Sequence, residues 1–128
     1  MTTAVVSAAI LYATLAPHPV GADQLPLIPG LDKVIHFIMF ATFTASMLFD
    51  LGRTNKAAPA GRRMALAGAV SVVFGAVDEL LQSYITENRS GDIIDWFADM
   101  AGIVTVLLIF AAWRHRHRHA THRPACRD

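Results

Sequence analysis

Charged residues are scarce in this chain: they make up 16% of its 128 residues, against roughly 25% in ordinary soluble domains. Its single cysteine, Cys126, excludes an internal disulfide. The sequence contains no HExxH motif, no P-loop and no serine nucleophile motif, so it lacks the common catalytic signatures. It also lacks the alternating pattern of strands and any internal repeat. What it has instead is apolar sequence, at 54% hydrophobic residues and a mean hydropathy of +0.42.

Four apolar stretches fill most of the chain, separated by polar or proline-rich connections. They run from Ala4 to Ala16, from Val34 to Leu51, from Met64 to Leu81 and from Ile93 to Trp113. The last three fall in the range of ~17–25 residues that crosses a bilayer, and the first is shorter. Because lipid offers the backbone no hydrogen bonds, spans of this kind must be helices. The sequence therefore predicts an all-α, polytopic transmembrane bundle of about four helices.

The ends of the chain predict a single transmembrane domain with a polar tail. We expect the domain to cover residues 1–113 and a basic His/Arg-rich tail to cover residues 114–128. A retained first helix is favoured over a cleaved signal peptide, because no Lys or Arg precedes it and Pro17 follows Ala16 directly. The tail suits a polybasic anchor for anionic lipid, with metal binding by its histidines as the lesser alternative.

The basic residues predict the orientation in the membrane. The second connection and the tail hold all but two of the eleven, namely Arg53, Lys56, Arg62, Arg63, Arg114, Arg116, Arg118, Arg123 and Arg127. The positive-inside rule then places both termini in the cytoplasm. Most of the acids lie toward the other, outer side, namely Asp23, Asp32, Asp78, Glu79, Glu87, Asp92, Asp95 and Asp99. Acids carry little weight in topology, so this asymmetry needs another cause.

The first polar segment opens the second apolar stretch. Asp32 and His36 are four residues apart and share a helix face. A structural role explains Asp32 as a helix cap and Lys33 as a side chain that reaches the membrane interface. His36 is explained less well in this way, because it lies one turn further in between apolar neighbours.

The second polar segment closes the third apolar stretch with Asp78, Glu79 and Gln82. Ser71, Gly75, Asp78 and Gln82 follow steps of four, three and four residues, which form one helical stripe. Small residues on such a stripe let helices approach closely, and polar ones bond a neighbouring helix. Two adjacent acids are costly in lipid, so we expect a partner for them; the alternative is an interfacial pair in water.

The third polar segment opens the fourth apolar stretch with Arg89, Asp92, Asp95 and Asp99. The first two acids suit a helix N-terminus, but Asp99 lies two turns in, beyond the reach of the helix dipole. Asp95, Asp99 and Gly102 share one face. Arg89 is the natural counter-ion or anion ligand, because a guanidinium binds phosphate or carboxylate in a forked geometry.

Together the three segments resemble the VanZ-like family. The residues that carry the resemblance are Pro26 to Lys33, His36, Phe37, Asp78, Glu79, Gln82, Arg89, Asp92, Asp95 and Gly102. The resemblance covers roughly residues 8 to 110 and implies a polytopic bacterial membrane protein. The family's namesake is associated with resistance to the glycopeptide teicoplanin. Two positions depart from the family's usual pattern, since Phe40 stands where Tyr is common and Asp99 where Asn is common.

Intramembrane ionisable groups mark functional sites by default, so we expect one outer-facing site. Its residues are predicted to be Asp32, Lys33, His36, Asp78, Glu79, Gln82, Arg89, Asp92, Asp95 and Asp99. The first hypothesis is a cell-envelope protein of the bacterial plasma membrane that binds or modulates a lipid-linked or glycopeptide-type headgroup. We expect membrane lipids as partners and no nucleic acid, cofactor or metal. A salt-bridge network that fixes helix register is the structural alternative.

The second hypothesis is a membrane enzyme that acts on a phospholipid or a polyprenyl phosphate at the outer leaflet. Glu79 or His36 would be the general base, and Arg89 with Lys33 would bind the phosphate. In this alternative the aspartates of the fourth stretch would hold a divalent cation through oxygen ligands. A third hypothesis, a structural partner of a larger complex, leaves the acids unexplained.

Overall fold

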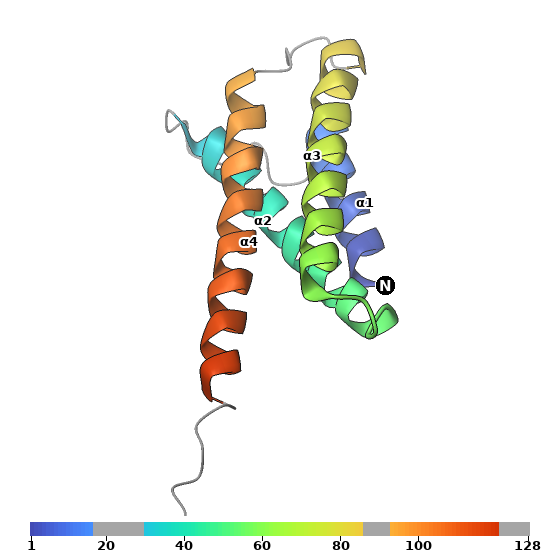
Figure 1. Cartoon of the computed structure of the whole chain (residues 1–128). Coiled ribbons are helices and arrows are strands. Elements are labelled where there is room, and N and C mark those ends of the chain that lie inside the picture. Colours follow the sequence, from blue (N-terminus) through green and yellow to red (C-terminus); the bar gives the residue numbers. More distant parts are fainter. Residues whose placement is uncertain (17–29, 86–92, 121–128) are drawn as a thin grey trace, which may run out of the picture.

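The computed structural model describes residues 1–16, 30–85 and 93–120, and these ranges contain four helices and no strand. The helices are α1 (Thr2–Leu15), α2 (Leu31–Thr54), α3 (Ala60–Ile85) and α4 (Ile93–Ala120). Figure 1 shows α3 and α4 side by side and α2 running obliquely across the bundle. The predicted all-α bundle of about four helices is therefore confirmed.

Three of the helices are long and apolar enough to cross a membrane. They are α2 with 24 residues, α3 with 26 and the part of α4 up to His117 with 25. With 14 residues, α1 is shorter; at ~1.5 Å per residue it reaches roughly 21 Å, less than the ~30 Å hydrocarbon core. The chain is thus a multi-pass membrane protein, and its first helix is shorter than the other three.

Helices α2 and α3 begin before the predicted apolar stretches and end after them, and a breaking residue stands directly before each of the two. Pro59 immediately precedes α3, and Gly30 precedes α2 with a φ of 84°, a conformation that glycine adopts without strain. At its other end α4 continues past Trp113 into the basic tract as far as Ala120. That tract has no Gly or Pro before Pro124, and arginine is a good helix former.

The bundle carries apolar side chains outside and many polar ones inside. Large apolar side chains such as Ile38, Val73 and Leu108 are more than half exposed, as expected for helices surrounded by lipid. The buried polar side chains are Thr14, His36, Thr44, Ser46, Ser71, Asp78, Gln82, Asp95 and Asp99. Several Ser and Thr hydroxyls bond a carbonyl one turn earlier in their own helix, as the buried Ser46 does to Phe43 at 2.8 Å. This bond satisfies a polar group where no water is available.

An aromatic cluster fills the apolar core between α2 and α3. The Phe43 and Phe74 rings stack with their centroids 4.7 Å apart, and Phe40 packs against both. Ile10 from α1 and Ile103 from α4 complete the buried core, so all four helices contribute to it. Phe40 has no hydroxyl to pair, which suits its fully buried position.

Helices α2 and α4 form the most extensive helix pair and approach closely at Gly102. A Cβ atom added there would lie 2.4 Å from the carbonyl oxygen of Phe37 and 3.1 Å from the amide nitrogen of Ala41. Both neighbours are backbone atoms, so they cannot move aside alone. Gly102 therefore fixes the distance between the two helices.

We predict that Gly102→Ala destabilises the bundle, because the added methyl group must push α2 and α4 apart. Overpacking of this kind costs about 1–3 kcal/mol, which denaturation of the purified protein in detergent would measure. Gly61→Ala is the matched control, since a Cβ at Gly61 meets nothing within 4 Å. Equal stability of the two variants would contradict the close approach.

Candidate functional site

Polar residues of three helices meet at one end of the bundle because of the chain's up-and-down course. The start of α2, the end of α3 and the start of α4 lie at this end (Figure 1). The described residues concerned, here called the polar cluster, are Asp32, Lys33, His36, Asp78, Glu79, Gln82, Asp95 and Asp99. The predicted stripe on α3 is observed, since Ser71, Gly75, Asp78 and Gln82 are all buried.

The deepest contact of the polar cluster joins α2 to α4. The Nδ1 atom of His36 lies 3.1 Å from Oδ1 of Asp99, and the two residues are 3% and 0% exposed. Glycines make the room for this contact: Gly102 holds the helices together one turn below, and a Cβ at Gly75 would lie 3.4 Å from Oδ2 of Asp99. The second oxygen of Asp99 has no hydrogen-bond partner among the described residues.

Glu79 adds a carboxylate from α3 to this contact. Its Oε1 atom lies 3.8 Å from Nδ1 of His36, and its side chain is 12% exposed. Neither Glu79 oxygen has a hydrogen-bond partner within residues 1–16, 30–85 and 93–120. His36, Glu79 and Asp99 each offer one possible ligand atom, and these atoms all lie within 4.8 Å of one another. The three therefore have the arrangement of a candidate cation site.

Asp78, the neighbour of Glu79, faces a different set of partners. Thr14 Oγ1 donates to its Oδ1 at 2.8 Å, and Gln82 Nε2 donates to its Oδ2 at 3.2 Å. The sequence predicted a partner for the acidic pair but missed Thr14. A signal was present, because Thr3, Ser7 and Thr14 share one face of the otherwise apolar α1. The first helix thus holds a buried acid of the third.

The outer rim of the polar cluster is an ion pair between α2 and α4. Lys33 Nζ lies 2.9 Å from Oδ1 of Asp95, which is buried. Asp32 is exposed, and Gly30 rather than Asp32 occupies the N-cap, without a side-chain capping bond. Asp32, His36 and Asp95 form a second group with possible ligand atoms within 4.8 Å of one another. His36 belongs to both groups and so links the rim to the interior.

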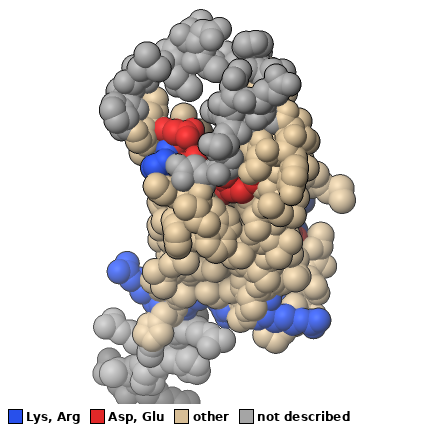
Figure 2. Space-filling view, turned by 90° about the horizontal axis from the view of Figure 1, so that it is seen from above, with Lys and Arg blue, Asp and Glu red and all other residues tan. Residues whose placement is uncertain are grey.

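Two predicted site residues, Arg89 and Asp92, lie outside the described residues. Among the described members, the polar cluster has five carboxyl groups against the ammonium group of Lys33 and the imidazole of His36. Figure 2 shows acidic side chains gathered in one part of the surface with a basic group beside them, while other basic groups lie apart. The surface of this cluster is therefore acid-rich, with a local cation at its rim.

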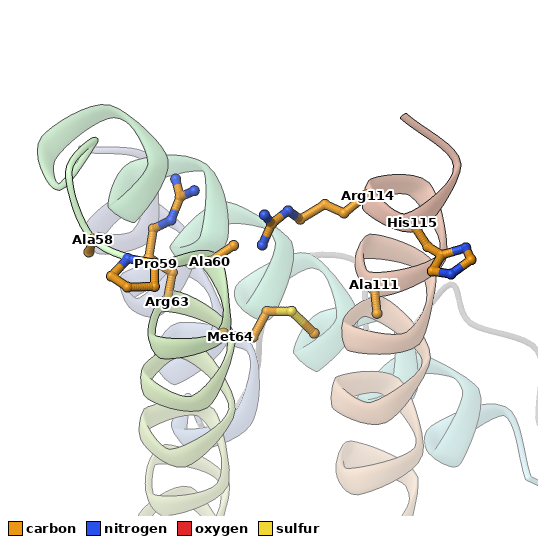
Figure 3. A pocket seen from close by; sticks show the side chains of 9 residues that line it. Ala58, Pro59, Ala60, Arg63, Met64, Ala111, Arg114 and His115 are labelled. Carbon is orange, nitrogen blue, oxygen red and sulfur yellow. The ribbon is translucent and has the colours of Figure 1, made fainter. Parts of the chain in front are cut away.

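A groove of ≈ 510 Å³ lies at the other end of the bundle, between the start of α3 and the end of α4. Figure 3 shows Arg114 extending from α4 toward α3, while His115 points away from that gap. Arg63 and Met64 line the α3 side. None of the sequence-predicted site residues lines this groove, so the basic groove and the polar cluster are separate features.

We predict that Thr14→Val destabilises the protein, because it removes a hydrogen bond from a carboxyl group that is fully buried. A buried acceptor left without this donor costs about 1–3 kcal/mol, measurable as reduced resistance to denaturation in detergent. Thr105→Val is the control, since Thr105 bonds only the carbonyl of Ala101 in its own helix. An equal effect in both variants would remove Thr14 from the support of Asp78.

Comparison with known proteins agrees with the pattern of residues. A protein-family model described as VanZ/LLP1 matches residues 3–114, a range that includes every described member of the polar cluster. Neither the curated proteins nor the solved structures gave a match. The resemblance inferred from the sequence is confirmed, and this membrane protein belongs to the VanZ/LLP1 family.

Proposed function

We propose that the protein binds the headgroup of a lipid-linked or glycopeptide-type ligand through the polar cluster. The observation that carries this proposal is the Lys33–Asp95 pair at the rim, directly above the buried His36–Asp99 contact. Ionisable side chains inside a membrane are costly and face either one another or a polar ligand. A cluster kept only for helix register would pair its members, yet Glu79 has no hydrogen-bond partner among the described residues.

The charge of the polar cluster favours a headgroup that carries an amine. Its carboxyl groups outnumber its cations, so an ammonium group is attracted where an isolated phosphate is repelled. Lys33 offers the complementary contact for a neighbouring phosphate or carboxylate. Both an ethanolamine-type phospholipid and an amine-bearing glycopeptide have this chemistry. The association of the family's namesake with teicoplanin supports a glycopeptide as one source.

We also expect lipid contacts at the end of the bundle opposite the polar cluster, here called the basic end. The Arg63 and Arg114 side chains line the groove between α3 and α4, next to the apolar surface of Met64. Such a combination suits an anionic lipid headgroup with its acyl chain, and each basic residue near an anionic surface contributes about 1 kcal/mol. This agrees with a bacterial plasma membrane and with the basic end facing the cytoplasm.

The test of the proposed function compares headgroups on the purified protein in neutral detergent, with chelator present. Native mass spectrometry should show stronger binding of phosphatidylethanolamine than of phosphatidylglycerol, because only the first has an amine. Teicoplanin distinguishes the glycopeptide source. Lys33→Met should weaken binding about tenfold, the equivalent of about 1.4 kcal/mol.

Lys56→Met is the matched control, because Lys56 is an exposed residue of the connection between α2 and α3 at the other end. The proposal is wrong if both lipids bind equally, or if the two lysine variants bind like the unchanged protein. Thermal unfolding of each variant separates lost binding from lost folding.

An enzyme that acts on a phospholipid or a polyprenyl phosphate is the second candidate function. The observation that favours it is the carboxylate of Glu79, which lies 3.8 Å from His36 and accepts no hydrogen bond from the described residues, because a general base needs an acceptor that can take a proton. Release of phosphate or of a lipid product from these substrates would support it. Glu79→Gln should then abolish release while headgroup binding persists.

For the orientation, we predict that both termini are cytoplasmic, because the basic residues gather beside the α2–α3 connection and the end of α4. A cysteine in place of the exposed Asn55 should be protected from a membrane-impermeant thiol reagent in intact cells. A cysteine in place of Tyr84, which is 85% exposed at the other end, should be labelled. Both variants carry Cys126→Ser, and labelling of position 55 alone would reverse the topology.

A further inference from the structure

Three side chains from three different helices converge in the interior of the polar cluster. His36 from α2, Glu79 from α3 and Asp99 from α4 place one possible ligand atom each within 4.8 Å of the others. The Nδ1 atom of His36 is 3.1 Å from Asp99 Oδ1 and 3.8 Å from Glu79 Oε1. Imidazole and carboxylate groups are the ligands of divalent transition metals.

The unused oxygens in this group independently indicate a missing partner. Asp99 is fully buried, and its Oδ2 atom has no hydrogen-bond partner among the described residues. Neither oxygen of Glu79 has a hydrogen-bond partner among these residues. Asp78 next to it is different, because Thr14 and Gln82 donate to it. A buried carboxylate oxygen without a hydrogen bond is unfavourable, and His36 is the one cationic side chain beside these two carboxylates among the described residues, so the unused oxygens suit a ligand with positive charge.

We propose that His36, Glu79 and Asp99 bind one divalent transition-metal ion, with Zn²⁺ as the best fit. Ligand atoms ~2.0–2.2 Å from a tetrahedral Zn²⁺ lie roughly 3.3–3.6 Å apart, and the observed separations of 3.1 and 3.8 Å from His36 Nδ1 lie on either side of this range. Two carboxylates and one divalent cation sum to zero charge, which lowers the electrostatic cost of burying the two acids. This proposal differs from the sequence-based expectation of no metal.

His36, Glu79 and Asp99, here called the inner group, fit a metal better than the outer group of Asp32, His36 and Asp95. In the outer group, Asp95 is already bonded to the ammonium group of Lys33, and Asp32 is exposed. A cation there would meet the positive charge of Lys33. Three protein ligands in the inner group also leave a fourth coordination position, as in zinc sites that bind water or a further ligand. The metal site stands on its own ligands and does not depend on headgroup binding.

The test is metal binding to the purified full-length chain, produced without an affinity tag of histidines. The C-terminal tract carries further possible ligands, so all variants are made in a background with these side chains replaced: His115→Ala, His117→Ala, His119→Ala, His122→Ala and Cys126→Ser. Metal content by mass spectrometry and titration with Zn²⁺, Mn²⁺ or Ca²⁺ should give one tightly bound Zn²⁺ per chain. X-ray absorption should show nitrogen and oxygen ligands, including one imidazole.

Single substitutions in the inner group then identify the ligands. His36→Gln, Glu79→Gln and Asp99→Asn should each weaken Zn²⁺ binding at least about 100-fold, because loss of an outer-shell partner alone costs 10–100-fold. Asp78→Asn is the matched control, since it changes a buried acid beside Glu79 that has other partners. Zn²⁺ should also raise the unfolding temperature of the background protein and of Asp78→Asn, but not that of the three inner-group variants.

Two outcomes would overturn the metal site: no Zn²⁺ on the folded background protein, or unchanged affinity in all three substitutions. Headgroup binding is measured separately with chelator present, so the two proposals fail independently. A protein that binds Zn²⁺ but no headgroup keeps the metal site alone. A protein that binds a headgroup with chelator present but takes up no Zn²⁺ keeps the proposed function alone.

Discussion

The close approach of α2 and α4 at Gly102 is the constraint on which the rest of the bundle depends. Backbone atoms of α2 occupy the space that a side chain at Gly102 would need. One turn earlier in α4, the same approach brings His36 of α2 to Asp99. Packing of backbone on backbone is therefore what sets the geometry of the polar cluster, and the hydrogen bond between the two side chains follows from it.

The polar groups inside the bundle differ in whether the protein itself satisfies their hydrogen bonds. Thr44 and Ser71 join α2 and α3 by a hydroxyl pair at 3.0 Å, and Thr3 of α1 donates to Asp50 of α2 near the basic end. These contacts are satisfied within the protein. The group around Glu79 and Asp99 is not fully satisfied among the described residues, and this difference is what supports the proposed binding role of the group.

Much of the architecture was predictable, because a bilayer imposes length and apolar composition on each crossing helix. The α3 stripe that ends at Gln82 and the α4 face of Asp95, Asp99 and Gly102 were both read from helical spacing. The end of α4 was not predictable from hydropathy, because the basic tract after Trp113 is polar. The helix nevertheless continues through it, since arginine is a good helix former. Thr14 was missed because a hydroxyl in an apolar helix is normally satisfied by its own backbone.

The sequence by itself determined the family, the helical class and the gathering of acids toward one end of the helices. Only the tertiary structure decided which acids are paired. Lys33 reaches Asp95, Thr14 reaches Asp78, and Glu79 is left beside His36. Spacing fixes the face on which a side chain lies, but its partner depends on the rotation and separation of neighbouring helices. Those are set by packing at contacts such as Gly102, whose partners are distant in the sequence.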